Sequence, residues 1–133
     1  MKIEHLNPAD SYNSLNTRGS TQVVTASAFS KIIAISGQLP LDADNQLIGK
    51  GDIEAQTRAC YDNIRKALRA AGADFPNVIR MTTYLTDLKS QAKGVRKVRA
   101  EYFGTTTPPA STMIEIPFLV GDALIEVEAL AVI

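Results

Sequence analysis

Two helical patterns on either side of one β-branched segment do most to limit how this chain can fold. Asp52 is suited to cap the first helix, and Gly72 to end it. The apolar residues between them recur at spacings of three and four: Ile53, Thr57, Cys60, Ile64, Ala67, Leu68 and Ala71. A second helix is predicted over residues 90–103, and the segment 78–85 between the helices has the composition of a strand.

Further strand patterns occur at both ends of the chain. Residues 21–27 and 31–36 are predicted to pair as a hairpin, followed by a loop over 37–52. Two more strands are predicted within residues 108–116 and 124–133. Each helix has one apolar stripe, so an α+β fold is expected, with both helices on one face of a mixed sheet. The other sheet face needs a cover, which subunit association would supply.

The last predicted strand carries two carboxylates in an apolar run. Alternation puts Glu126 and Glu128 on one face, together with Leu124, Leu130 and Val132. Burying an unpartnered polar group costs about 2 kcal/mol or more, so both should face a cleft, a cation or a partner subunit. The alternative is that they lie on a solvated face. Cys60 falls on the apolar stripe of the first helix and is interpreted as a core residue.

Length and composition exclude several classes of protein. The 133 residues suit one domain (1–133), with a polar segment over 1–20 for which mobility is expected. Equal numbers of basic and acidic residues, 14 each, favour neither nucleic acid nor a membrane as partner. One cysteine and one histidine, His5, argue against a metal site or a histidine triad. No apolar run is long enough to span a bilayer, so the cytoplasm is the expected location.

Several segments, taken in their order along the chain, resemble the RidA/YjgF family, formerly called endoribonuclease L-PSP. They are ISGQLPLD, the stretch from QTRACYDN to TYLTDL, VRAEYFG, PPASTMIEI and IEVEALAVI, and together they cover nearly all of the chain from Gln22. The resemblance implies a chorismate-mutase-like subunit with a sheet of about six strands and two helices on one face. It also implies a homotrimer whose sheets form a central barrel, with ligand clefts between adjacent subunits.

The resemblance also implies an activity. Family members hydrolyse small enamines and imines without a cofactor, as 2-iminobutanoate/2-iminopropanoate deaminases do. An arginine after the Pro-Ala pair binds the substrate carboxylate, and a glutamate on the last strand activates water. Glu126 matches that glutamate, and Gly37 and Met113 match positions that contact the ligand. A ligand carrying a carboxylate or a carbonyl is therefore expected.

This chain departs from the family pattern at the substrate clamp. Ser111 stands where the deaminases have arginine, and Ser20 is nearest to the position of an expected aromatic residue. A neutral hydroxyl cannot replace a charge-assisted pair, so binding of a small carboxylate should weaken. One hypothesis is that Arg96 reaches towards Ser111 and Glu126 and supplies the missing cation. The alternative is that Arg96 and Arg99 belong to a solvated basic face.

Three functions stay open on the sequence. The first is an enzyme with Glu126 as the water-activating base. The second is a trimeric small-molecule-binding or regulatory protein that kept the cleft and lost the chemistry; the altered clamp favours it. The third, a ribonuclease or translation inhibitor, finds little support because the chain has zero net charge and no tryptophan.

Overall fold

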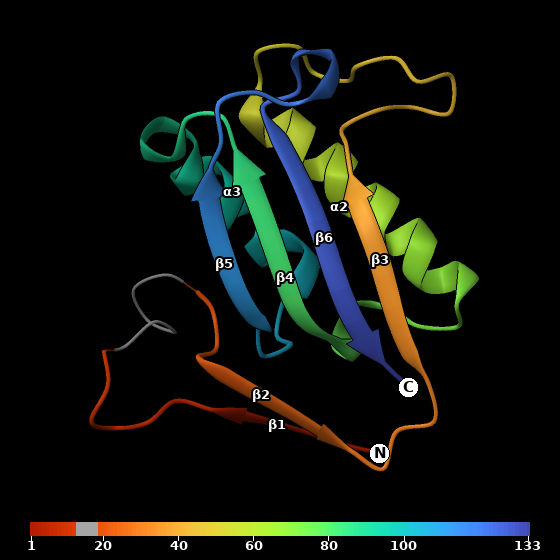
Figure 1. Cartoon of the computed structure of the whole chain (residues 1–133), viewed down its shortest axis with the longest axis vertical. Coiled ribbons are helices and arrows are strands. Elements are labelled where there is room, and N and C mark those ends of the chain that lie inside the picture. Colours follow the sequence, from red (N-terminus) through yellow and green to blue (C-terminus); the bar gives the residue numbers. More distant parts are fainter. Residues whose placement is uncertain (13–18) are drawn as a thin grey trace.

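A mixed sheet with two helices on one face forms the body of the protein (Figure 1). The computed structural model describes residues 1–12 and 19–133. The sheet has the spatial strand order β3 (Ile32–Gln38), β6 (Ile125–Val132), β4 (Val78–Leu85) and β5 (Ala110–Glu115). β6 is antiparallel to both of its neighbours, whereas β4 and β5 are parallel. The connections from β3 to β4 and from β4 to β5 contain α2 (Ile53–Ala70) and α3 (Leu88–Phe103).

Both helices begin at aspartate caps. Asp52 accepts a hydrogen bond from the backbone N–H of Ala55 at 3.1 Å, and Asp87 accepts one from the N–H of Ser90 at 3.3 Å. The predicted helices are therefore confirmed, although α3 starts two residues earlier than expected. Gly104 ends α3 with a φ of 55°, which favours glycine.

The core lies between the helices and the sheet. From β6, Ile125 and Val127 are fully buried under the helices. The helices contribute Ile64, Leu68 and Val95, each with no exposed surface. Burying a side chain of this size stabilises the fold by about 1.5–3 kcal/mol, so this face holds the molecule together. Cys60 is also fully buried, and burial raises the pKa of its thiol, which confirms its interpretation as a core residue.

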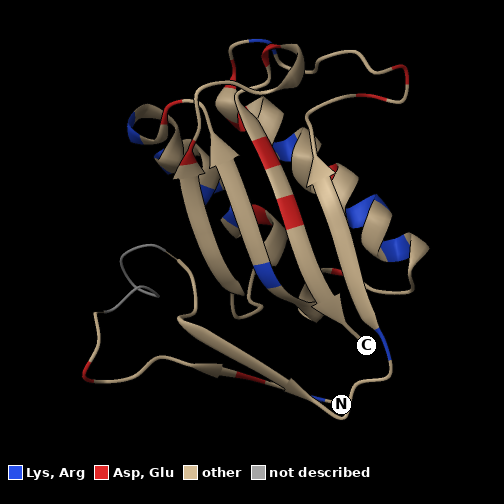
Figure 2. Cartoon of the chain, viewed as in Figure 1, with Lys and Arg blue, Asp and Glu red and all other residues tan. Residues whose placement is uncertain are grey.

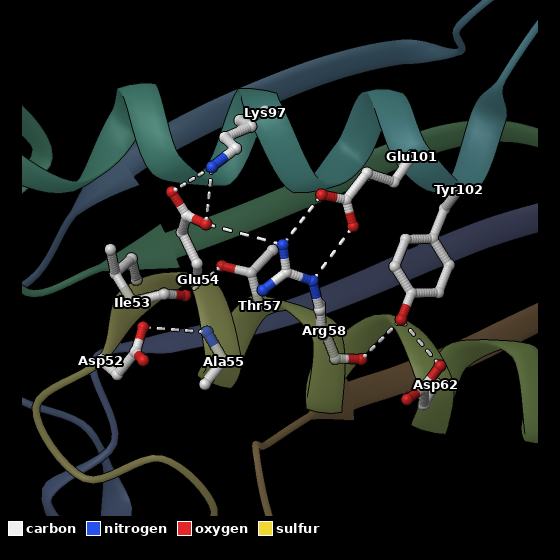
Figure 3. A network of polar contacts seen from close by, with 10 residues as sticks. All are labelled: Asp52, Ile53, Glu54, Ala55, Thr57, Arg58, Asp62, Lys97, Glu101 and Tyr102. Atoms are coloured by element: carbon white, nitrogen blue, oxygen red, sulfur yellow. Dashed lines mark hydrogen bonds and ion pairs between the residues drawn. The ribbon is translucent and has the colours of Figure 1, made fainter.

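Charged side chains join the outer surfaces of the two helices (Figure 3). The Arg58 guanidinium donates two hydrogen bonds to Glu101, at 3.0 and 2.8 Å, and Lys97 contacts Glu54 at 3.1 Å. The bond from Arg58 lowers the pKa of Glu101. These exposed pairs connect α3 to α2 along the outer surface of the helix layer.

The N-terminal strands form a separate ribbon instead of the predicted hairpin. β2 (Val23–Ser27) pairs with β1 (Lys2–Leu6), not with β3, so the hairpin prediction is wrong. β3 pairs with β6, because the N–H groups of Ser30 and Lys31 bond to the carbonyl of Ile133 and direct the chain towards that strand. The predicted set of about six strands is thus divided into sheets of four and two. β1 lies in the predicted polar segment 1–20, of which residues 13–18 are outside the described residues.

One short contact ties the segment before β2 to β5. Thr21 forms a parallel bridge with Ala110, and its N–H donates to the carbonyl of Pro109 at 3.1 Å. Its hydroxyl donates to the carbonyl of Pro108 at 2.6 Å. Ser20 is consequently buried beside the start of β5.

Candidate functional site

A cavity of about 400 Å³ lies between α3, β5 and the segment before β2. Its described lining consists of Tyr12, Ser20, Leu88, Arg96, Arg99, Ser111, Thr112 and Met113. Four of the predicted ligand-contacting residues, Ser20, Arg96, Ser111 and Met113, therefore lie around one space. The volume is within the usual range for small-molecule sites.

Arg99 is the principal cation of this cavity. Its side chain leaves α3, is only 5% exposed, and donates from Nη1 to Ser111 Oγ at 3.0 Å. Burial lowers the pKa of Arg99, and the positive charge of Arg96 lowers it further. The backbone at Gly19 also passes close by, since a Cβ there would lie 3.5 Å from Nη2. The interpretation of Arg99 as part of a solvated face is therefore wrong.

Arg96 lies one turn earlier on α3 and is exposed. It lines the cavity, but the guanidinium that contacts Ser111 belongs to Arg99 and not, as hypothesised, to Arg96. Sequence reasoning missed this because residues three apart share a helix face, and only the packing of α3 on β5 decides which of them is buried. Tyr12 and Leu88 were also missed, since neither belongs to a recognisable motif.

Glu126 and Glu128 face away from the helices. In the register of the sheet, Glu126 lies opposite Tyr84, which lies opposite Ile114, so all three share the open face. Figure 2 shows two acidic positions along β6. Tyr84 donates to Glu128 Oε1 at 3.2 Å, and burial together with the charge of Glu128 raises the pKa of Tyr84. Glu128 thus has a partner in its own chain.

Gly37 and Glu126 are in direct contact. A β-bulge between Ile35 and Gln38 brings Gly37 beneath the carboxylate, where an added Cβ would lie 2.1 Å from Glu126 Oε1. A larger residue at position 37 would therefore require the Glu126 carboxylate to move. The sequence predicted both residues as parts of one site, and the structure brings them together.

Ser111 and Glu126, in contrast, lie on opposite faces of the sheet. Ser111 differs by an odd number of residues from Ile114 on the same strand, so it faces the helices, while Glu126 shares the open face with Ile114. Within one subunit, the Arg99 and Glu126 side chains therefore lie on opposite sides of the sheet.

Other kinds of site find no support among residues 1–12 and 19–133. No group of three His, Cys, Asp or Glu side chains there is arranged to hold a metal ion. Within the same ranges, no helix is both long and apolar enough to cross a bilayer.

Comparison with known proteins identifies the family. A family model described as Endoribonuclease L-PSP matches residues 15–133. The chain belongs to this family, which is the RidA/YjgF family. The fold agrees, because YyfB of Yersinia pestis, a protein of the conserved Rid family, superposes with a TM-score of 0.90 at 29% identity. That match covers 100% of both chains and so includes the β1–β2 ribbon.

Two relatives illustrate the range of the RidA/YjgF family. A RutC family protein of Pyrococcus horikoshii is 42% identical and covers 84% of each chain. The 3-aminoacrylate deaminase RutC of Acinetobacter baylyi is 33% identical, over 81% of this chain and 84% of its own.

Proposed function

We propose that the protein hydrolyses a small enamine or imine that carries a carboxylate, and that Arg99 binds this carboxylate beside Ser111. The observation that carries the proposal is the buried guanidinium of Arg99, 3.0 Å from Ser111 Oγ. The deaminase pattern has its clamp arginine at position 111. Here the cation comes from α3 instead of β5 but reaches the same place. Similarity to a relative named as a 3-aminoacrylate deaminase supports the reaction class.

Glu126 is the proposed base. Its carboxylate accepts a proton from water while the water oxygen bonds to the imine carbon, and the proton then passes to the nitrogen. The hydroxyl proton of the resulting carbinolamine then passes through the Glu126 carboxylate to the nitrogen as the carbon–nitrogen bond breaks, which releases ammonia and leaves the keto acid. Because Glu126 and the cavity lie on opposite faces, we propose that Glu126 of one subunit completes the cavity of the next in a homotrimer.

The proposal is tested by ammonia release from imines generated in situ by an amino-acid oxidase. We expect Glu126→Gln to lower kcat by roughly 100-fold or more, as loss of a general base does. Arg99→Lys should mainly raise KM, by about tenfold or more, since an ammonium cannot reproduce the planar fork of donors. Lys93→Gln, an exposed change on the same helix, is the control. A folded, assembled Glu126→Gln protein with the wild-type rate would overturn the catalytic role.

A second candidate function is ligand binding without turnover. It is favoured by the contact of Glu126 with Gly37, on the face away from the cavity. In this case 2-oxobutanoate would bind and depend on Arg99, while no imine would release ammonia above the uncatalysed rate.

A further inference from the structure

The charges around the cavity are one-sided. Two guanidinium groups, those of Arg96 and Arg99, line it, and none of its described lining residues is an aspartate or a glutamate. Like charges in a partly desolvated space repel each other, so a cavity lined by two cations favours an anion.

Arg96 differs from several other cations of the helices in having no acidic partner. Arg58 pairs with Glu101, Lys97 with Glu54, and Arg65 with Asp74. Among the residues that the structure describes, Arg96 forms no ion pair, although Lys97 beside it does. Its charge therefore remains available to a ligand.

The two guanidinium groups also differ in depth. Arg99 is 5% exposed and held against Ser111, whereas Arg96 is exposed. Side chains three apart on a helix have Cβ atoms about 5–6 Å apart, and both arginines line the same cavity, so the two cations belong to one site with a buried end and an open end. Its buried end is suited to a carboxylate next to the reacting carbon, and its open end to a second anionic group.

We propose that this cavity selects ligands with two anionic groups, as in the imine or enamine of a short dicarboxylic acid. The carboxylate next to the reacting carbon binds Arg99 and Ser111, and the distal carboxylate binds Arg96. A cavity of about 400 Å³ has room for such a molecule. This inference rests on the proposed function for the reaction, while the choice between one and two anionic groups is decided by binding alone.

The experiment compares stable keto acids as probes. The affinity of the purified full chain for 2-oxoglutarate and 2-oxobutanoate is measured by calorimetry or ligand-detected NMR at one fixed ionic strength. We expect 2-oxoglutarate to bind about tenfold or more tightly, which is the effect of one additional charge-assisted contact. In Arg96→Gln the two affinities should come within about twofold of each other, whereas Lys93→Gln should keep the wild-type preference.

Equal affinities in the wild-type protein, or a preference that survives Arg96→Gln, would overturn the inference. Circular dichroism of each variant verifies that it is folded. Turnover separates this result from the proposed function. Ammonia released equally well from imines of mono- and dicarboxylic acids would leave the hydrolase in place and reject the two-anion site. Tighter binding of the dicarboxylate without ammonia release from any imine would support the two-anion site and reject the hydrolase.

Discussion

Along β6, successive residues face two different environments. Ile125 and Val127 have no exposed surface beneath the helices, whereas Glu126 and Glu128 are half-buried on the opposite face. The first face supplies most of the apolar contacts that stabilise the fold. The second carries the carboxylates, at positions where the helices give no cover. Alternation along one strand thus separates the residues of the core from the face that carries the proposed base.

The same division separates the two parts of the proposed site. The cations lie on the helix side, at the edge formed by β5, and Glu126 lies on the open side. If the proposed function holds, the cation that binds the ligand can therefore come from α3 without contact with the proposed base. In the proposed site, the residue that binds the carboxylate and the residue that activates water thus lie on different faces of the sheet.

The largest expected effect comes from truncating the buried side of β6. Ile125→Ala should lower the free energy of unfolding by about 2–5 kcal/mol, because it leaves a cavity in the core. Leu130→Ala on the open face is the matched change and should have a much smaller effect on unfolding. Urea denaturation measures both, with size-exclusion chromatography to detect any change in assembly. Similar losses of unfolding free energy in the two variants would contradict the conclusion that the helix-covered face of β6 supplies most of the stability.

A smaller effect is expected at the contact between Gly37 and Glu126. Gly37→Ala should push the carboxylate aside and destabilise the fold by about 1–3 kcal/mol, as overpacking does. If Glu126 is the base, moving its carboxylate should also lower the rate of ammonia release. Ser36→Ala, at an exposed neighbouring position, is the control. Wild-type activity in a folded Gly37→Ala protein would separate the position of Glu126 from catalysis.

The sequence predicts the elements better than their partners. Caps and apolar periodicity located α2, α3 and β4 to within about two residues, because these signals are local. The pairing of β2 was predicted wrongly, since a β-branched run looks the same whichever strand lies beside it. β1 was missed because it is short and lies in a polar segment.

The site shows the same limit. Gly37 and Glu126 were predicted together from the family resemblance, and the structure places them in contact. One alternative from the sequence placed the Arg99 side chain on a solvated face. Its burial depends on how α3 packs against β5, and no local sequence pattern reports that packing. The opposite facing of Ser111 and Glu126 depends on strand register, which a single sequence does not give.

A modest pH effect is expected on the helix side. Hydrogen bonds from the Ser90 side chain and backbone hold the pKa of Asp87 below its ordinary 3.8. The stabilisation of α3 by this cap is therefore full above that pH and is lost as the pH falls through the lower folded value. Thermal melting followed by circular dichroism between about pH 5 and pH 2.5 should show a steeper loss for wild type than for Asp87→Asn, whose cap does not titrate. If the melting temperatures of wild type and Asp87→Asn fell in parallel with pH, the Asp87 cap would not be the source of the pH dependence.

The smallest effect is expected at the exposed helix pairs in Figure 3. Arg58→Gln removes the contact with Glu101, but solvent and salt screen such pairs. The melting temperature should fall slightly at low ionic strength, and the difference from wild type should shrink at about 0.5 M salt. A large, salt-independent loss would show that Arg58 acts through packing instead.

The Thr21 contact also affects the exposed edge of the four-stranded sheet. β5 ends the four-stranded sheet, and an unpaired edge strand invites another chain to extend it. By bridging Ala110 and bonding to Pro109, Thr21 occupies the first backbone groups along that edge. The segment around Thr21, which lines one side of the cavity, thus also covers the start of β5 and makes edge-to-edge aggregation there less favourable.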